Sequence, residues 1–350
     1  MPNIWLVLVV YVSWFSLLSR TMSVAASTAS VSPRPRRHRP PAAPLLDYDV
    51  VIVGAGSAGL SAALVLGRCL RRVLVCDGGA PRNAPSPGVQ SFFTRDGIKP
   101  ADLLRLGHEQ LRPYTTVEVR TVRVVNLEAT PAGFQLTLEE ESGRTSVCTT
   151  RKVLLATGVQ DVLPEVEGMR ELWGRGVLHC PYCHGWEVRD EPLAVFGHSK
   201  TVTGLALLVS RWSKDVIVCT DGSTCLTTNA LRRLRQHGIK VRQEKISQLE
   251  GTKTGKLRHI VFENGEKLER TAVFIHPHQQ QRSQLAEQLG CRFTKKGGVW
   301  VNKNAETTFP GLYAAGDATP GTQQALLAAA KGGQAAICIN EQLTREECPK

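Results

Sequence analysis

A glycine-rich turn at residues 54–59 constrains the fold of this chain more than any other feature of its sequence. The turn follows a short apolar, β-branched run, Asp49–Val53, and it precedes a stretch of helical composition, Leu60–Leu70. A second apolar run, Arg72–Cys76, ends at Asp77, about 20 residues beyond the turn. A strand, a glycine turn, a helix and a second strand in this order predict a parallel βαβ unit of the dinucleotide-binding type.

Each glycine of the string Gly54-Ala55-Gly56-Ser57-Ala58-Gly59 has a mechanical role in such a turn. The first permits the tight turn, the second lets the backbone approach a pyrophosphate, and the third lets the helix pack closely on the strand. The helix N-terminus offers free N–H groups and the positive end of its dipole to the phosphates. The acid after the second strand binds ribose hydroxyls. The candidate cofactor-binding residues of this unit are Gly54, Gly56, Ser57, Ala58, Gly59, Asp77 and Gly78.

A later part of the chain repeats the same order of elements. Leu193–Phe196 has the pattern of a buried strand, Gly197 follows it, a helical stretch extends to Trp212, and Val216–Cys219 forms the next strand. The sequence predicts that a helix at Asn229–Gln236 and strands near Val241, near Ile260 and at Thr271–Ile275 complete this second unit. The length of 350 residues suits two domains. We therefore predict an α/β fold with two Rossmann-like nucleotide-binding domains.

Two further segments have readable patterns. Val117–Leu138 alternates between apolar and polar residues, as the strands of a β-hairpin do. Near the C-terminus, an apolar strand ends at Gly316-Asp317, and a helix is expected from Gln323 to about Asn340.

The N-terminal segment is expected to direct the chain to a compartment. The apolar run Ile4–Leu18 is shorter than the roughly 20 residues of a membrane span and suits a secretory signal, with Val24-Ala25-Ala26 as a cleavage site. Arginine, serine and threonine without any acid before Asp47 are also typical of an organellar transit peptide. A secretory signal is slightly favoured over the organellar alternative and over an uncleaved tail. The Pro-rich stretch Pro33–Pro44 then reads as a linker.

The net charge of +12 raises the question of nucleic-acid binding. Five of the arginines lie in the N-terminal segment, and the rest of the chain has no basic run interleaved with aromatic residues. The distribution of charge therefore argues against a nucleic-acid partner.

Ten cysteines are present, and only Cys180 and Cys183 form a close pair. Such a CxxC pair suits reversible disulfide chemistry, in which a lowered thiol pKa and a mixed disulfide are typical. With His184 the pair also matches a c-type haem attachment motif, and with His179 it offers ligands for zinc. No second ligand pair is present, which disfavours zinc without excluding it. The other cysteines have the scattered spacing of buried thiols.

The glycine turn, the strand end Ala156-Thr157-Gly158 and the Gly316-Asp317 box together resemble the flavin-dependent pyridine nucleotide–disulfide oxidoreductases. The resemblance covers about residues 47–345. In that family the FAD domain is split in sequence and an NAD(P)-type domain is inserted into it. The resemblance implies a targeting segment and linker at 1–46, the first part of the FAD domain at 47–162, an inserted domain with the CxxC at 163–286, and the second part of the FAD domain at 287–350.

The position of the cysteine pair, at the start of the inserted domain, resembles the low-molecular-weight thioredoxin reductase branch. The string from His179 to Glu187 and the Arg82-Asn83 pair are similar to the gliotoxin-oxidase-like subgroup. The resemblance implies a homodimer, FAD as cofactor, Cys183 as the thiol beside the flavin, and Cys180 as the interchange thiol. It further implies cofactor contacts from Arg82, Asn83, Gly158, Gly316, Asp317, Gln324 and Ala325.

His184 stands where thioredoxin reductases have an aspartate that acts as acid and base. Histidine titrates near neutral pH, so His184 is the candidate proton carrier and His179 the second candidate. The alternative is a histidine that only hydrogen-bonds the backbone.

The sequence departs from the family where NADPH would bind. The turn Gly197-His198-Ser199-Lys200-Thr201-Val202 has a serine at the close-approach position and a valine at the position of the last small residue. Asp221 lies where basic residues hold the 2′-phosphate, and Gln323 replaces an arginine near the flavin. NADPH binding is therefore left open.

Two directions of electron flow remain possible. With NADPH, electrons would reach an external disulfide through FAD and the cysteine pair, and the partner would be a small disulfide or a thioredoxin-like protein. Without NADPH, a small-molecule dithiol would reduce the pair and oxygen would take the electrons. A redox-inactive FAD-binding module is the alternative from another class, and the presence of both cysteines argues against it.

Overall fold

The computed structural model describes residues 46–198, 201–224 and 226–349. The predicted targeting segment and linker lie outside the described residues except for Leu46, and so do Ser199 and Lys200. Within the described part of the chain, no helix has the length and the apolar character that a membrane crossing requires.

The first sheet joins strands that are far apart in the sequence. Its members are β1 (Tyr48–Val53), β2 (Val73–Cys76), β3 (Val117–Arg120), β4 (Arg123–Thr130), β5 (Gly133–Glu139), β6 (Thr145–Leu155) and β17 (Leu312–Ala314). Their order is β3-β2-β1-β6-β5-β4, and β17 also pairs with β6. β1 is parallel to both β2 and β6, and its residues Val50–Val53 are all buried. A parallel strand that is covered on both faces is expected to be continuously apolar.

The predicted hairpin is confirmed for β4 and β5, which pair in antiparallel fashion. It is wrong for β3, which pairs in parallel with β2. The helix α2 (Pro100–Leu111) lies between β2 and β3 in the chain and provides the crossover that a parallel pair needs.

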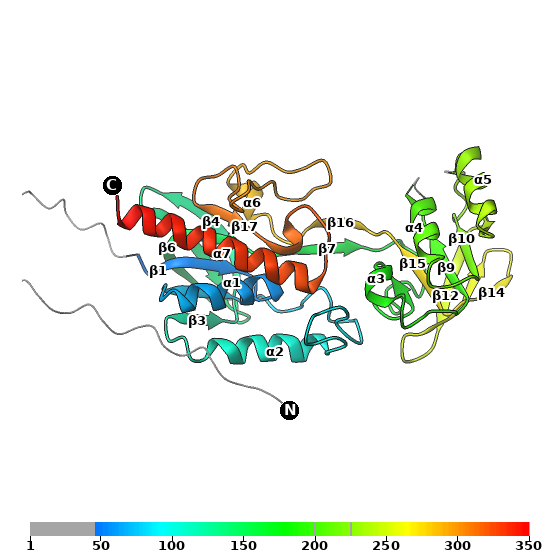
Figure 1. Cartoon of the computed structure of the whole chain (residues 1–350), viewed down its shortest axis with the longest axis horizontal. Coiled ribbons are helices and arrows are strands. Elements are labelled where there is room, and N and C mark those ends of the chain that lie inside the picture. The colour runs from blue at the N-terminus through cyan, green and yellow to red at the C-terminus, as the bar shows by residue number, and fades with distance from the viewer. Residues whose placement is uncertain (1–45, 199–200, 225, 350) are drawn as a thin grey trace, which may run out of the picture. The chain divides into compact units, whose positions relative to one another are not determined.

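Two helices, α1 (Ser57–Arg68) and α7 (Ala325–Glu347), lie side by side against the first sheet (Figure 1). Their buried residues share one apolar core with β1 and β2. α7 continues past the predicted end near Asn340. Arg71 donates to the Asn340 side chain at 2.7 Å and to Glu347 at 2.6 Å, and Leu343 is buried, so tertiary contacts hold a polar stretch in helical form.

The second sheet is entirely parallel and carries the second predicted nucleotide unit. It contains β8 (Val177–Leu178), β9 (Leu193–Phe196), β10 (Val216–Cys219), β11 (Lys240–Arg242) and β15 (Ala272–Ile275), in the order β11-β10-β9-β15-β8. The helices of this unit are α4 (Val202–Val209) and α5 (Thr228–Gln236). The prediction that the first helix extends to Trp212 is wrong, because the α-helix ends at Val209 and the chain continues to Trp212 in turns whose N–H groups bond three residues back.

The strand predicted near Ile260 is present and shares a core with β9 and β10, but it is not part of the parallel sheet. It is β13 (Leu257–Phe262), which forms a separate antiparallel sheet with β12 (Ile246–Gly251) and β14 (Lys267–Glu269).

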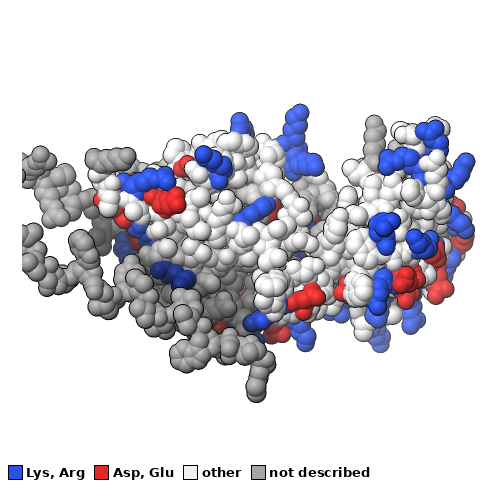
Figure 2. All heavy atoms as spheres, viewed as in Figure 1, with Lys and Arg blue, Asp and Glu red and all other residues white. Residues whose placement is uncertain are grey.

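On the described residues of the face in Figure 2, basic side chains are scattered among acidic ones and do not form a continuous stripe.

A two-stranded ribbon, absent from the sequence prediction, joins the two main sheets along the chain. β7 (Val159–Val162) and β16 (His278–Gln281) pair in antiparallel register, with Val159 opposite Gln281 and Val162 opposite His278. After the ribbon, Leu285 and Ala286 of α6 (Leu285–Gln288) pack in the core of the first sheet. The predicted boundary at residue 286 therefore falls inside α6.

Candidate active site

A cavity of about 990 Å³ opens at the carboxyl ends of β1, β2 and β6. Ligand pockets for drug-sized molecules span roughly 300–1,000 Å³, so this volume suits a dinucleotide. In open α/β sheets, ligands bind at this end of the strands. Among the predicted cofactor residues, all except Gly59 line the cavity, namely Gly54, Gly56, Ser57, Ala58, Asp77, Gly78, Arg82, Asn83, Gly158, Gly316, Asp317, Gln324 and Ala325.

The glycine turn has the geometry that its spacing predicts. Gly54 has φ +109°, and a Cβ on Gly59 would lie 1.8 Å from the Gly54 carbonyl oxygen, so the fold itself needs both residues. A Cβ on Gly56 would meet no atom within 4 Å and would point into open space. Gly56 is the N-cap of α1. Because glycine has no side chain, the first N–H groups of this helix receive no hydrogen bond from the capping residue's side chain. These features fit a bound dinucleotide phosphate.

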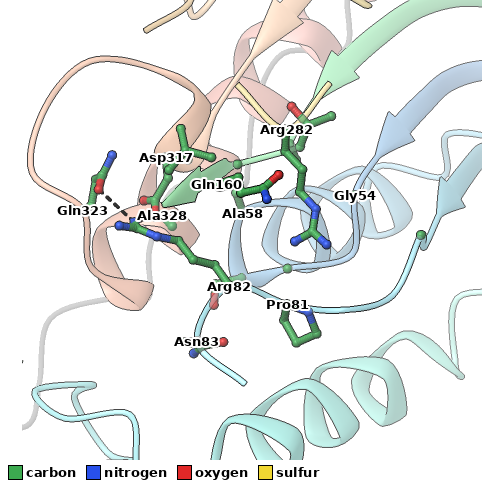
Figure 3. A pocket seen from close by; sticks show the side chains of 18 of the residues that line it. Gly54, Ala58, Pro81, Arg82, Asn83, Gln160, Arg282, Asp317, Gln323 and Ala328 are labelled. Carbon is green, nitrogen blue, oxygen red and sulfur yellow. Dashed lines mark hydrogen bonds and ion pairs between the residues drawn. The ribbon is translucent and has the colours of Figure 1, made fainter. Parts of the chain in front are cut away.

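Arg82 is the centre of a buried polar network that the sequence analysis did not predict. Its Nε and Nη2 atoms donate to the two carboxylate oxygens of Asp161 at 2.7 and 2.8 Å. Its Nη1 donates to Asp317 at 2.9 Å and to the Gln323 amide oxygen at 2.8 Å, the contact dashed in Figure 3. The Asp161 side chain is only 4% exposed. Burial raises the pKa of Asp317, and the Arg82 charge opposes that rise.

Gln279 connects this network to the ribbon. Its amide donates to Asp161 at 3.0 Å and exchanges two 2.9 Å hydrogen bonds with the amide of Gln323. Asp161 and Gln279 belong to β7 and β16, whereas Gln323 precedes α7. Neither ribbon residue stands in a motif with a known spacing, so nothing in the sequence alone marked them.

Arg282 is a second basic side chain of the cavity that the sequence analysis missed. Figure 3 shows it extending toward Pro81, and its Nη1 donates to the carbonyl of the preceding residue, Ala80, at 2.5 Å.

Cys180 and Cys183 form a disulfide with a Cα–Cα distance of 5.3 Å. Cys180 caps the one-turn helix α3 (Pro181–His184), and its sulfur accepts a hydrogen bond from the Cys183 N–H at 3.2 Å. Cys183 lines the cavity and Cys180 does not. Only one residue of the pair therefore lines the cavity, and it is the one that was predicted to be the flavin-side thiol; the two separate roles stay a prediction.

Two histidines next to the disulfide also line the cavity. Burial lowers the pKa of His179 to about 4 and lowers the pKa of His184 below its ordinary value of 6.5. Both imidazoles are therefore neutral at neutral pH, and a neutral imidazole is a proton acceptor.

The other cysteines of the described residues differ from this pair. Burial raises the pKa of Cys76 and Cys219 to about 12 and that of Cys148 to about 11, which makes these thiols unreactive. Cys291 is also buried, whereas Cys69 and Cys348 are exposed. In the part of the chain that is described, no three His, Cys, Asp or Glu side chains converge in the way that a metal site requires.

A chain with two Rossmann-like units, a cavity of dinucleotide size and a disulfide with one sulfur on that cavity defines a dinucleotide-dependent thiol–disulfide oxidoreductase. Residues 48–332 match the model of the pyridine nucleotide-disulphide oxidoreductase family. The chain belongs to this family, and it is an FAD-dependent disulfide oxidoreductase. The resemblance predicted from the sequence is confirmed.

Individual relatives agree with this assignment. The chain is 30% identical to thioredoxin reductase sirT from Leptosphaeria maculans, over 84% of this chain and 94% of the relative. It is 37% identical to the solved structure of HlmI, with a TM-score of 0.79, over 86% of this chain and 93% of HlmI. An oxidoreductase from Agrobacterium tumefaciens also matches, with 28% identity, a TM-score of 0.79, and coverage of 87% of this chain and 100% of the other.

We expect Asp161→Asn to lower the free energy of unfolding by about 2–3 kcal/mol, because the buried Arg82 guanidinium would keep only one charged partner. Urea denaturation followed by circular dichroism measures this change. Glu140→Gln is the control, since the ion pair of Glu140 with Arg144 is exposed and its loss is expected to leave the midpoint unchanged. Equal midpoints for the Asp161 variant and the wild type would show that the network does not stabilise the fold.

Proposed function

We propose that this protein oxidises a small-molecule dithiol to its disulfide, with oxygen as the terminal acceptor and without NADPH. One observation supports this direction of electron flow above the others. At the inserted unit, the His198 Nε2 atom lies 3.1 Å from an Asp221 carboxylate oxygen, and this contact joins the two loops that would enclose a nucleotide.

Asp221 is further fixed by its second oxygen, which accepts a hydrogen bond from the Ile246 N–H at 2.7 Å. A carboxylate in this place repels the 2′-phosphate of NADPH, whereas an arginine would attract it. The described residues place no arginine or lysine in an ion pair with Asp221. The local charge thus disfavours NADPH.

The two strand-to-helix connections also differ in length. α1 begins at Ser57, soon after β1 ends at Val53, whereas α4 begins only at Val202 after β9 ends at Phe196. A Cβ on Gly197 would make an ordinary 3.4 Å contact with Val202, so this glycine is not required by a close approach of the helix. Both differences depart from the short turn and closely packed glycines that are typical of a dinucleotide site.

The proposed reaction conserves atoms and electrons. The first sulfur of the dithiol bonds to Cys180 while the Cys180–Cys183 bond breaks, and the electron pair leaves on Cys183. The second sulfur of the substrate then displaces Cys180 and closes the substrate disulfide. When bound, FAD supplies the two-electron acceptor that regenerates the protein disulfide and delivers the electrons to oxygen. In sum, one dithiol and one O₂ give one disulfide and one H₂O₂.

Anaerobic titration of the FAD-loaded protein separates the two directions. We expect dithiothreitol to bleach the visible flavin absorbance and excess NADPH to leave it unchanged. Subsequent admission of air should restore the band and produce hydrogen peroxide in equal amount. Bleaching by stoichiometric NADPH would contradict the proposal. It would support the second candidate, an NADPH-dependent disulfide reductase, which agrees with the name thioredoxin reductase of the Leptosphaeria maculans relative.

Two features of the sequence complete the proposal. We infer that the protein acts as a homodimer, as its resemblance to the thioredoxin reductase branch implies, and that residues 1–46 direct it to the secretory pathway or to an organelle. Light scattering of the purified chain tests the first inference, and microscopy of a C-terminally tagged full-length chain tests the second.

A further inference from the structure

The orientation of the His184 imidazole is determined by a serine on a different segment of the chain. Its Nε2 atom lies 3.1 Å from the Ser86 hydroxyl oxygen, and the same oxygen lies 2.8 Å from the Gly88 carbonyl oxygen. A serine hydroxyl has one hydrogen and two lone pairs. The carbonyl can only accept, so the hydroxyl donates to Gly88 and accepts from His184. The proton of the neutral imidazole therefore resides on Nε2.

The other ring nitrogen keeps a free lone pair. Nδ1 is buried and has no hydrogen-bond partner among the described residues. The Cys180 carbonyl is the group that a proton on Nδ1 would face. This carbonyl already accepts from the N–H groups of Cys183 and His184, at 3.1 and 3.2 Å, which occupy both of its lone pairs. In the opposite tautomer the Nδ1 proton would have to share this carbonyl with two backbone N–H donors, and Ser86 would have to give up its bond to Gly88 to donate to Nε2.

The helix α3 directs this lone pair toward the interchange cysteine. Cys180 is the N-cap of α3, and His184 is the last residue of this helix. A helical side chain leans toward the N-terminus of its helix. The imidazole interacts with the Cys180 carbonyl, and since Nε2 faces Ser86, Nδ1 is the ring nitrogen on the Cys180 side.

We propose that Ser86 is a positioning residue that holds His184 as the neutral Nε2–H tautomer, so that Nδ1 accepts the proton of the Cys180 thiol. This inference rests on the proposed role of Cys180 as the interchange thiol and not on the direction of electron flow. When the reduced Cys180 attacks a disulfide, its S–H bond breaks and the proton moves to Nδ1. A new S–S bond forms, the external S–S bond breaks, and the leaving sulfur takes the electron pair. In the opposite direction, the second sulfur of a dithiol displaces Cys180 from the mixed disulfide, and Nδ1 returns the proton to the leaving Cys180 sulfur.

The pH dependence follows from the surroundings of His184. The titratable side chain that interacts with it is His179, which in turn interacts with Arg82, Asp161 and His276. Burial keeps His184 neutral at neutral pH, so the base is available there. As the pH falls through the lowered pKa of His184, Nδ1 becomes protonated and the reactivity of Cys180 is expected to fall.

Nuclear magnetic resonance tests the tautomer without any turnover. In protein labelled with ¹⁵N-histidine, His184 is assigned by comparison with His184→Gln. We expect the wild type at neutral pH to show a protonated Nε2 and an unprotonated Nδ1, and Ser86→Ala to show a mixture of tautomers. A protonated Nδ1 in the wild type would overturn the proposal.

Alkylation of the reduced protein tests the consequence. With iodoacetamide at neutral pH, the Cys180 S–H proton passes to Nδ1, the sulfur bonds to carbon, and iodide leaves. We expect Ser86→Ala to slow labelling of Cys180 by about tenfold, which is less than the roughly 100-fold to 10,000-fold effect of a whole general base because His184 itself remains. Ser86→Thr, which retains a hydroxyl, should restore most of the rate. The exposed Cys69 is an internal control in the same mass spectra.

The outcomes separate this inference from the proposed function. An unchanged labelling rate in Ser86→Ala would overturn the inference, even if dithiothreitol reduces the flavin as proposed. Flavin reduction by NADPH would overturn the proposed direction and leave both tautomer and labelling results intact, because neither measurement uses NADPH, oxygen or a dithiol substrate.

Discussion

Cys183→Ser is expected to lower dithiol-dependent oxygen consumption by at least about a thousandfold, as the loss of a covalent catalytic group typically does. Cys183 is the cysteine of the pair that lines the cavity, so without its sulfur the electron pair of the substrate is expected to have no route toward the flavin. An oxygen electrode and a coupled peroxide assay measure the rate. Turnover equal to the wild type would remove the cysteine pair from the mechanism and would favour the redox-inactive alternative.

The two cysteines are expected to differ in their spectra. Cys180→Ser leaves the Cys183 thiolate beside the flavin and should show a long-wavelength charge-transfer band, whereas Cys183→Ser should show none. Cys69→Ser is the matched control, since Cys69 is an exposed free thiol outside the cavity, and it should retain full activity. A charge-transfer band in the Cys183 variant alone would reverse the assigned roles.

Gly56→Val is expected to weaken FAD binding by about 100-fold, or roughly 2.8 kcal/mol, without unfolding the apoprotein. The structure allows this separation because a Cβ at Gly56 meets no atom within 4 Å, and its backbone, with φ −75°, accepts any residue. The added side chain would instead occupy the space predicted for the pyrophosphate. Quenching of flavin fluorescence measures the affinity, and the melting temperature of the apoprotein measures the fold.

Two other glycines make this experiment specific. Gly204 lies in α4 with equally open surroundings, so Gly204→Val should leave FAD affinity unchanged. Gly59→Ala should destabilise the apoprotein itself, because its Cβ would collide with the Gly54 carbonyl. Equal losses of FAD affinity in the Gly56 and Gly204 variants would place the cofactor elsewhere.

The sequence was sufficient wherever local chemistry determines structure. Strands such as Leu193–Phe196 and Val216–Cys219 are confirmed residue by residue. A parallel strand that is buried on both faces is apolar at every position, so the sequence shows it as one continuous apolar run. The glycine turn was predictable because its steric requirements are local. The same holds for the cysteine pair, whose spacing alone permits a disulfide.

The remaining features depend on contacts between distant residues. Asp161 is one acid among many until β7 pairs with β16 and brings it to Arg82. The C-terminal turns of α7 are polar and gain their stability from Arg71. Ser86 is an ordinary loop serine until α3 brings His184 to it. Such contacts form only in the folded chain, and the local sequence around each residue does not predict them.

The register of the ribbon determines where the segment that contains the second parallel sheet could be excised from the chain. The chain leaves the first sheet at Val159 and returns at Gln281, directly opposite each other in the register of β7 and β16. Paired strands lie only about 5 Å apart, so a two-residue hairpin could join Val162 to His278 and replace everything between them. Such an excision is expected to remove the second parallel sheet together with Cys180 and Cys183, and to leave a shorter chain that retains the glycine turn, Arg82 and Asp317 but lacks the exchanging disulfide.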